Sequence, residues 1–158
     1  MLKKHWDIFV LLAVLALDLA SKQVISTQIN LHQNITVIPN FFAVTYYQNT
    51  GMAWGLFSNA PVLLTLVSIV ITFVLITIYV DAYKHSETFM RLCTMLMIGG
   101  ALGNLYDRLF LGYVRDFLSF NIFGYAFPIF NIADSALVIG GILWVGYCLF
   151  SEYKGKGE

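Results

Sequence analysis

The sequence predicts an all-α membrane protein with four transmembrane helices and a small extracytoplasmic β-structure between the first two. The composition is 59% hydrophobic and 11% charged, with a mean hydropathy of +0.76, whereas about a quarter of the residues in a soluble domain are charged. Four apolar runs each have roughly the 20 residues that cross about 30 Å of hydrocarbon as a helix. A β-branched and aromatic stretch separates the first two runs. At 158 residues, we expect a single integral-membrane domain spanning 1–158.

We expect the helices at about residues 6–25, 62–80, 89–111 and 130–150. Backbone groups in lipid must be satisfied within their own segment, which favours helices over other spanning forms. The third run contains Gly99, Gly100 and Gly103, and small residues allow close helix packing. The first run partly resembles a cleavable secretory signal. An aspartate within it, Asp18, and the three runs that follow favour an uncleaved helix.

The basic residues predict the orientation, because cytoplasmic segments carry an excess of Lys and Arg. With a cytoplasmic N-terminus, the outer side holds Lys22, Arg108 and Arg115. The inner side then holds more cations, namely Lys3, Lys4, Lys84, Arg91, Lys154 and Lys156. Both termini are therefore predicted to be cytoplasmic.

The long outer connection, residues 26–61, is predicted to form a small sheet on the outer membrane surface. Ile35–Ile38 and Phe41–Tyr47 are rich in β-branched and aromatic residues and are separated by a Pro39–Asn40 turn. Trp54 and Phe57 suit the membrane interface. The second outer connection, residues 112–128, is shorter and aromatic.

Several functional classes are not supported. The formal net charge is zero, so no basic surface is expected to bind nucleic acid. Cys93 and Cys148 lie in apolar runs, and the three histidines are scattered without metal-ligand spacing. We expect no metal site and no cofactor.

Four acidic residues belong to the outer ends of the predicted helices, namely Asp18, Asp107, Asp116 and Asp134. A charge at the bilayer centre costs roughly 2.5–3.5 kcal/mol on insertion scales, so such residues are functional candidates unless they are paired. Asp18 and Lys22 share a helix face at i and i+4, which is consistent with either a local ion pair or a direct role. Asp107 is equally consistent with a helix end that enters water.

Asp116 and Asp134 are the favoured catalytic candidates. Two carboxylates that share one site cannot both ionise easily, so one keeps a proton. Together they can activate a water and protonate a leaving amine. Ser21 and Ser135 have no adjacent histidine, which argues against a serine mechanism. Spacing alone leaves a proton relay in a transporter open as an alternative.

These residues lie in five stretches that together resemble bacterial lipoprotein signal peptidase, also called signal peptidase II. The stretches are Asp18–Lys22, Asn49–Gly55, Gly99–Arg108, Val114–Phe117 and Phe130–Ser135. Each stretch alone is a weak signal, but all five in this order, in a chain with four spans, form a specific one.

The resemblance implies a membrane-embedded aspartic endopeptidase with Asp116 and Asp134 as the catalytic pair. It implies that Asn49, Gly51, Asn104, Arg108 and Asn131 shape or contact the substrate site, and that Asp18, Lys22 and Asp107 support it. The implied substrate is a diacylglyceryl-modified prolipoprotein, cleaved before its lipidated cysteine at the outer face of the bacterial cytoplasmic membrane. Membrane lipid is then a partner, and globomycin-type cyclic peptides are inhibitors.

Two positions depart from the family pattern, namely Leu19, where the family often has Gln, and Arg115, where it usually has an apolar residue. Arg115 either lowers the pKa of Asp116 by proximity or points to water. The rival functions are a small multi-pass transporter or proton-relay protein, and a non-enzymatic lipid-binding subunit. We expect a monomer, since no further helix has a polar face that would have to be buried against a partner.

Overall fold

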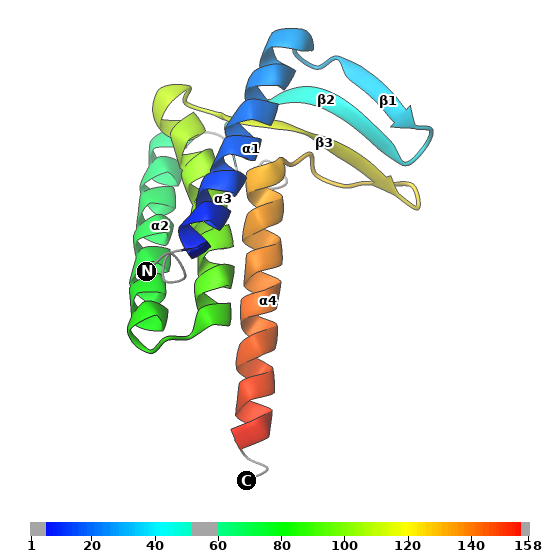
Figure 1. Cartoon of the computed structure of the whole chain (residues 1–158). Coiled ribbons are helices and arrows are strands. Elements are labelled where there is room, and N and C mark those ends of the chain that lie inside the picture. Colours follow the sequence, from blue (N-terminus) through cyan, green and yellow to red (C-terminus); the bar gives the residue numbers. More distant parts are fainter. Residues whose placement is uncertain (1–5, 52–59, 156–158) are drawn as a thin grey trace.

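The computed structural model describes residues 6–51 and 60–155. Four long helices run side by side, with a sheet at one end of the bundle (Figure 1). They are α1 (Trp6–Gln28), α2 (Pro61–Lys84), α3 (Thr88–Phe110) and α4 (Ile132–Gly155). Each is long and apolar enough to cross a membrane, which confirms the predicted fold class.

The sheet is antiparallel, with the strand order β1-β2-β3-β4. β1 (Asn34–Ile38) and β2 (Phe42–Asn49) form the predicted hairpin, and Asn40 in its turn has a φ of 58°. β3 (Val114–Ile122) and β4 (Tyr125–Ala126) come from the connection between α3 and α4. The sequence did not lead us to expect these two strands. β3 is held by its pairing with β2, a distant contact that local composition does not report.

The helix boundaries differ from the predicted ones at several ends. α1 continues to Gln28 and α2 to Lys84, because a helix does not have to stop where its apolar run stops. α4 begins at Ile132 instead of 130, because Asn131 caps it, and continues to Gly155. Trp54 and Phe57, the Met52–Gly55 part of the second motif and the terminal lysines Lys3, Lys4 and Lys156 lie outside the described residues.

α3 is the central helix and packs against each of the other three. The core is a cluster of buried side chains, namely Leu75, Met95, Met97, Ile98 and Ala101. Glycines allow the close approaches. A Cβ atom on Gly100 would overlap the carbonyl oxygen of Ala133 in α4, and one on Gly103 would overlap the carboxylate of Asp18 in α1. α3 therefore brings polar residues of α1 and α4 close to its own.

An ion pair joins the helices at the end of the bundle that lies away from the sheet. Asp7 of α1 is fully buried and accepts hydrogen bonds from Nε of Arg91 at 2.9 Å and from the Tyr79 hydroxyl at 2.8 Å. These partners belong to α3 and α2, so the contacts join three helices. A buried carboxylate needs such partners because its desolvation is costly.

We expect Gly100→Ala to destabilise the protein by about 1–3 kcal/mol, because the added methyl group must separate α3 from α4. The matched control is Gly146→Ala in α4, where an added Cβ meets nothing within 4 Å. This control should be neutral or slightly stabilising, since alanine favours helices. Thermal unfolding of both variants in detergent micelles measures the difference, and equal melting temperatures would refute the packing argument.

Candidate active site

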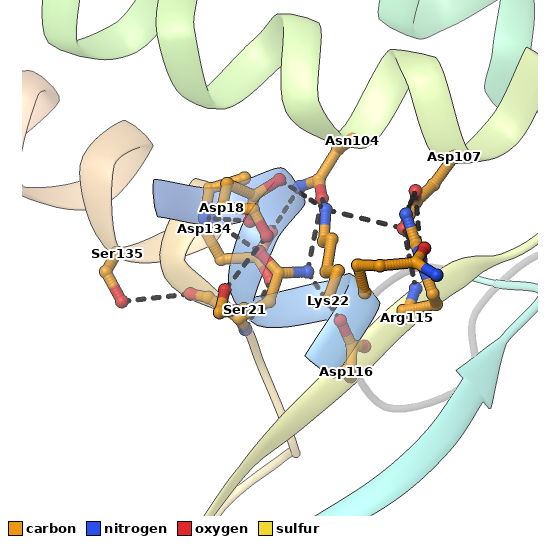
Figure 2. Close-up of polar contacts among 12 residues, drawn as sticks. Asp18, Ser21, Lys22, Asn104, Asp107, Arg115, Asp116, Asp134 and Ser135 are labelled. Atoms are coloured by element: carbon orange, nitrogen blue, oxygen red, sulfur yellow. Dashed lines mark hydrogen bonds and ion pairs between the residues drawn. The ribbon is translucent and has the colours of Figure 1, made fainter. Parts of the chain in front are cut away.

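Polar residues from α1, α3, α4 and β3 gather where the sheet meets the bundle (Figure 2). The four acids predicted to lie at the outer helix ends, Asp18, Asp107, Asp116 and Asp134, belong to one hydrogen-bonded network there. Asp18 and Asp107 are fully buried, and Asp116 is 2% exposed. The network brings together residues that are more than 100 positions apart in the chain.

Asp116 lies on β3 and faces amide donors. Its Oδ2 accepts a hydrogen bond from Nδ2 of Asn49 at 2.9 Å, and its Oδ1 accepts one from Nδ2 of Asn131 at 2.6 Å. Burial raises the pKa of Asp116 to about 7, and the negative charge of Asp134 acts in the same direction. The two amide donors oppose this rise because they stabilise the charged carboxylate.

Asp134 lies in the first turn of α4 and is held from two directions. Its Oδ1 accepts a hydrogen bond from Nδ2 of Asn104 at 2.7 Å, and its Oδ2 accepts one from the backbone N–H of Asn131 at 3.1 Å. In return, Oδ1 of Asn131 accepts the backbone N–H of Asp134 at 2.9 Å. This reciprocal arrangement is a capping box, which fixes both the start of the helix and the direction of the carboxylate. The side chain of Asn131 thus contacts both candidate catalytic residues.

Lys22 is fully buried at the centre of the network. Its Nζ lies 2.7 Å from the Asp18 carboxylate, 2.9 Å from Oδ1 of Asn104 and 3.5 Å from Asp107. The contact to Asn104 turns that amide so that its NH₂ group points at Asp134. Asp18 and Lys22 do form the i, i+4 ion pair considered from the sequence, but inside the bundle and not at its surface.

Arg115 points neither to water nor to Asp116. It is 6% exposed, and its guanidinium donates to Asp107, with Nη2 2.7 Å from Oδ1. The interpretation that Arg115 points to water is therefore wrong, and its hydrogen-bond partner is Asp107. The sequence did carry a signal for the pair, because Asp107 and Arg115 are opposite charges that flank a short connection.

A cavity of about 610 Å³ opens beside the two carboxylates. Asp116 and Asp134 line it, as do four of the residues expected to contact substrate, namely Asn49, Gly51, Asn104 and Arg108. Asn131, which was expected with them to shape or contact the substrate site, is fully buried and holds the two aspartates. Asp18, Lys22 and Asp107 lie in the network without lining the cavity, as a supporting role requires. The roles of all these residues remain predictions.

The cavity has a polar end and an apolar wall. Leu137, Val138 and Ile139 of α4 continue the lining away from Asp134, and Val138 and Ile139 are exposed. Phe127–Phe130 forms another part of the wall, a role that the sequence analysis did not assign to it. The cavity therefore places hydrogen-bonding groups next to an apolar surface, as ligand sites with a few oriented polar groups do.

Comparison with known proteins identifies the family. Residues 10–150 match the family model described as signal peptidase (SPase) II. The chain belongs to the signal peptidase II family. It is 40% identical to a lipoprotein signal peptidase of Staphylococcus haemolyticus, over 99% of both chains. It is 38% identical to one of Staphylococcus aureus, over 96% of this chain and 92% of that one.

Two solved structures described as bacterial membrane enzymes share the fold. One, determined at 2.3 Å, matches with a TM-score of 0.85 and 38% identity, over 95% of this chain and 90% of that chain. The other, determined at 1.9 Å, matches with a TM-score of 0.80 and 39% identity, over 90% and 92% of the two chains. Signal peptidase II is a peptidase family, so the site described above belongs to a membrane peptidase.

We expect Asn131→Ala to be less stable than Asn131→Ser by about 0.5–2 kcal/mol, since serine keeps an oxygen that caps α4 and alanine does not. Both substitutions remove the amide that bridges Asp116 and Asn104. The comparison therefore isolates the cap. Unfolding of the two variants in the same detergent measures this difference, and equal stability would show that the cap contributes nothing.

Proposed function

We propose that this chain is an aspartic endopeptidase that removes the signal peptide from diacylglyceryl-modified prolipoproteins, cleaving before the lipidated cysteine. Membership of the signal peptidase II family supports signal-peptide removal from prolipoproteins. The observation that carries the catalytic assignment is the pair Asp116 and Asp134, both held by Asn131 and both lining one cavity.

The pair holds one proton and one negative charge near neutral pH. The raised pKa of Asp116 supports this state, because two close carboxylates resist joint ionisation. The charged carboxylate removes a proton from water as the water oxygen attacks the scissile carbonyl carbon. The protonated carboxyl gives its proton to the carbonyl oxygen. When the C–N bond breaks, the leaving amine takes up the proton that the first carboxylate had removed from water. The other carboxylate recovers its proton from a hydroxyl of the tetrahedral intermediate, so the pair returns to its starting state.

Other cavity residues are proposed to position the peptide. The guanidinium of Arg108 offers a fork of donors for peptide carbonyl oxygens. Asn49 and Gly51 lie at the end of β2 and beside Asp116, where an extended segment passes the reacting bond. The apolar wall of α4 faces the signal helix, and the acyl chains of the lipidated cysteine stay in the bilayer.

The proposed site lies at the extracytoplasmic face of the bacterial cytoplasmic membrane, with both termini in the cytoplasm. Hydrolysis needs water and the lipid anchor needs hydrocarbon, and this interface supplies both. We further propose that the chain acts as a monomer and that globomycin-type cyclic peptides occupy the cavity. A transporter would place acids at several depths as a relay. The buried acid at the other end, Asp7, is instead paired with Arg91 at 2.8 Å.

We expect Asp116→Asn and Asp134→Asn each to lower kcat by about 10²–10⁴-fold, since each removes a proton-transfer group. The measurement is signal-peptide release from a prolipoprotein that carries diacylglycerol and from its unmodified form. Asp81→Asn is the matched control, because Asp81 is 74% exposed at the other end of the bundle. If Asp116→Asn and Asp134→Asn were both as active as the unmutated enzyme, the mechanism would be excluded. If the unmutated enzyme cleaved the unmodified prolipoprotein as fast as the lipid-modified one, the stated substrate would be excluded.

We expect kcat/KM to fall about tenfold per unit as pH rises above about 7, because Asp116 keeps its proton up to that pH and loses it above. Asn49→Ala removes a donor that lowers the pKa of Asp116. In this variant the alkaline limb should therefore move to higher pH. The pH profiles of both enzymes test this, and a limb that stays in place or moves to lower pH contradicts the assignment.

A further inference from the structure

We propose that Arg115 is a positioning residue of the peptidase. By binding Asp107, it keeps the carboxyl groups of Asp116 and Asp134 directed at the same part of the cavity. This inference rests on the proposed function of the two aspartates. It concerns a residue that neither lines the cavity nor belongs to the proposed catalytic pair.

Arg115 binds Asp107 through both its side chain and its backbone. Nη2 lies 2.7 Å from Oδ1, and Nε lies 3.2 Å from each carboxylate oxygen. The backbone N–H of Arg115 donates to Oδ2 at 3.0 Å. The Nη1 atom also reaches Oε1 of Gln23 in α1 at 3.4 Å. A planar guanidinium held at this many points has little freedom to move.

The hydrogen bonds between Arg115 and Asp107 fix the direction of the Asp116 side chain. Successive side chains of a strand point to opposite faces. With the Arg115 side chain directed to Asp107, the next side chain, Asp116, is directed to the amides of Asn49 and Asn131. Because the Arg115 backbone is also held, β3 cannot rotate about its axis without breaking bonds to Asp107.

The same pair affects Asp134 through Lys22. Figure 2 shows Asp107 reached by both Lys22 and Arg115. Because Arg115 supplies the close contacts to Asp107, the Lys22 ammonium stays nearer to Asp18 and to Asn104, at 2.7 and 2.9 Å. Asn104 in turn donates to Asp134. Among the described contacts, Asp107 has two cationic partners, Lys22 and Arg115. If Arg115 were removed, the Lys22 ammonium would be drawn toward Asp107 and would lose its hydrogen bond to Asn104.

The test compares Arg115→Met, Arg115→Lys and the double variant Asp107→Asn with Arg115→Met. Turnover of a diacylglyceryl-modified prolipoprotein is measured per folded enzyme, and Lys84→Met, which removes an exposed cation at the other end, is the control. We expect Arg115→Met to lower kcat on the order of 10²-fold with little change in KM, because misaligned groups lose rate and not binding. Arg115→Lys should recover part of the loss.

The double variant should be more active than Arg115→Met, because a neutral amide at position 107 does not draw Lys22 away from Asn104. This amide still has an oxygen for the backbone N–H of residue 115. Wild-type kcat in folded Arg115→Met would overturn the inference, as would a loss explained entirely by a smaller amount of folded enzyme. A double variant no more active than Arg115→Met would also count against it. Failure of the wild type to cleave would instead refute the proposed function, so the two failures are distinguishable.

Discussion

A buried ammonium group, at the end of the bundle where the sheet lies, organises the polar interior of this protein. Lys22 is fully buried, and an ammonium taken out of water must be paired and hydrogen-bonded. Its partners are a carboxylate one helical turn away in α1 and two side chains of α3, Asn104 and Asp107. Asp18 extends the arrangement to α4, because its Oδ1 accepts the backbone N–H of Ala133 at 2.9 Å. One charge thus specifies how three helices meet.

The proposed catalytic pair, Asp116 and Asp134, lies at the edge of this network, where the environment changes. Asp116 is almost fully buried, whereas Asp134 is partly exposed and lines the cavity. Amide groups lie between the pair and the fully charged interior, so Asp116 and Asp134 are each held by neutral donors. Neutral donors fix the direction of a carboxyl group without forcing it to stay ionised, as a direct ion pair would. A shared proton is compatible with such surroundings.

The sequence predicted what depends on local pattern. The four apolar runs gave the helices, and the alternation around Pro39–Asn40 gave the first hairpin. β3 was missed because its pairing with β2 depends on residues about 70 positions away, and the polar residues within it resemble a loop. The partner of Arg115 was missed for a similar reason. Its neighbour in the chain, Asp116, suggested a local effect, but its partner Asp107 is at the end of another element.

Asn131 shows why a residue's role in such a site cannot be assigned from its position in a motif. The resemblance placed it among residues that shape or contact the substrate site, and its complete burial favours the first of these roles. Its oxygen caps α4, and its amide group donates to Asp116 and to Asn104. The start of the fourth helix is therefore tied to the strand that carries Asp116. A change that loosens this cap also moves the pair, so the stability of α4 and the alignment of the two carboxylates depend on the same hydrogen bonds.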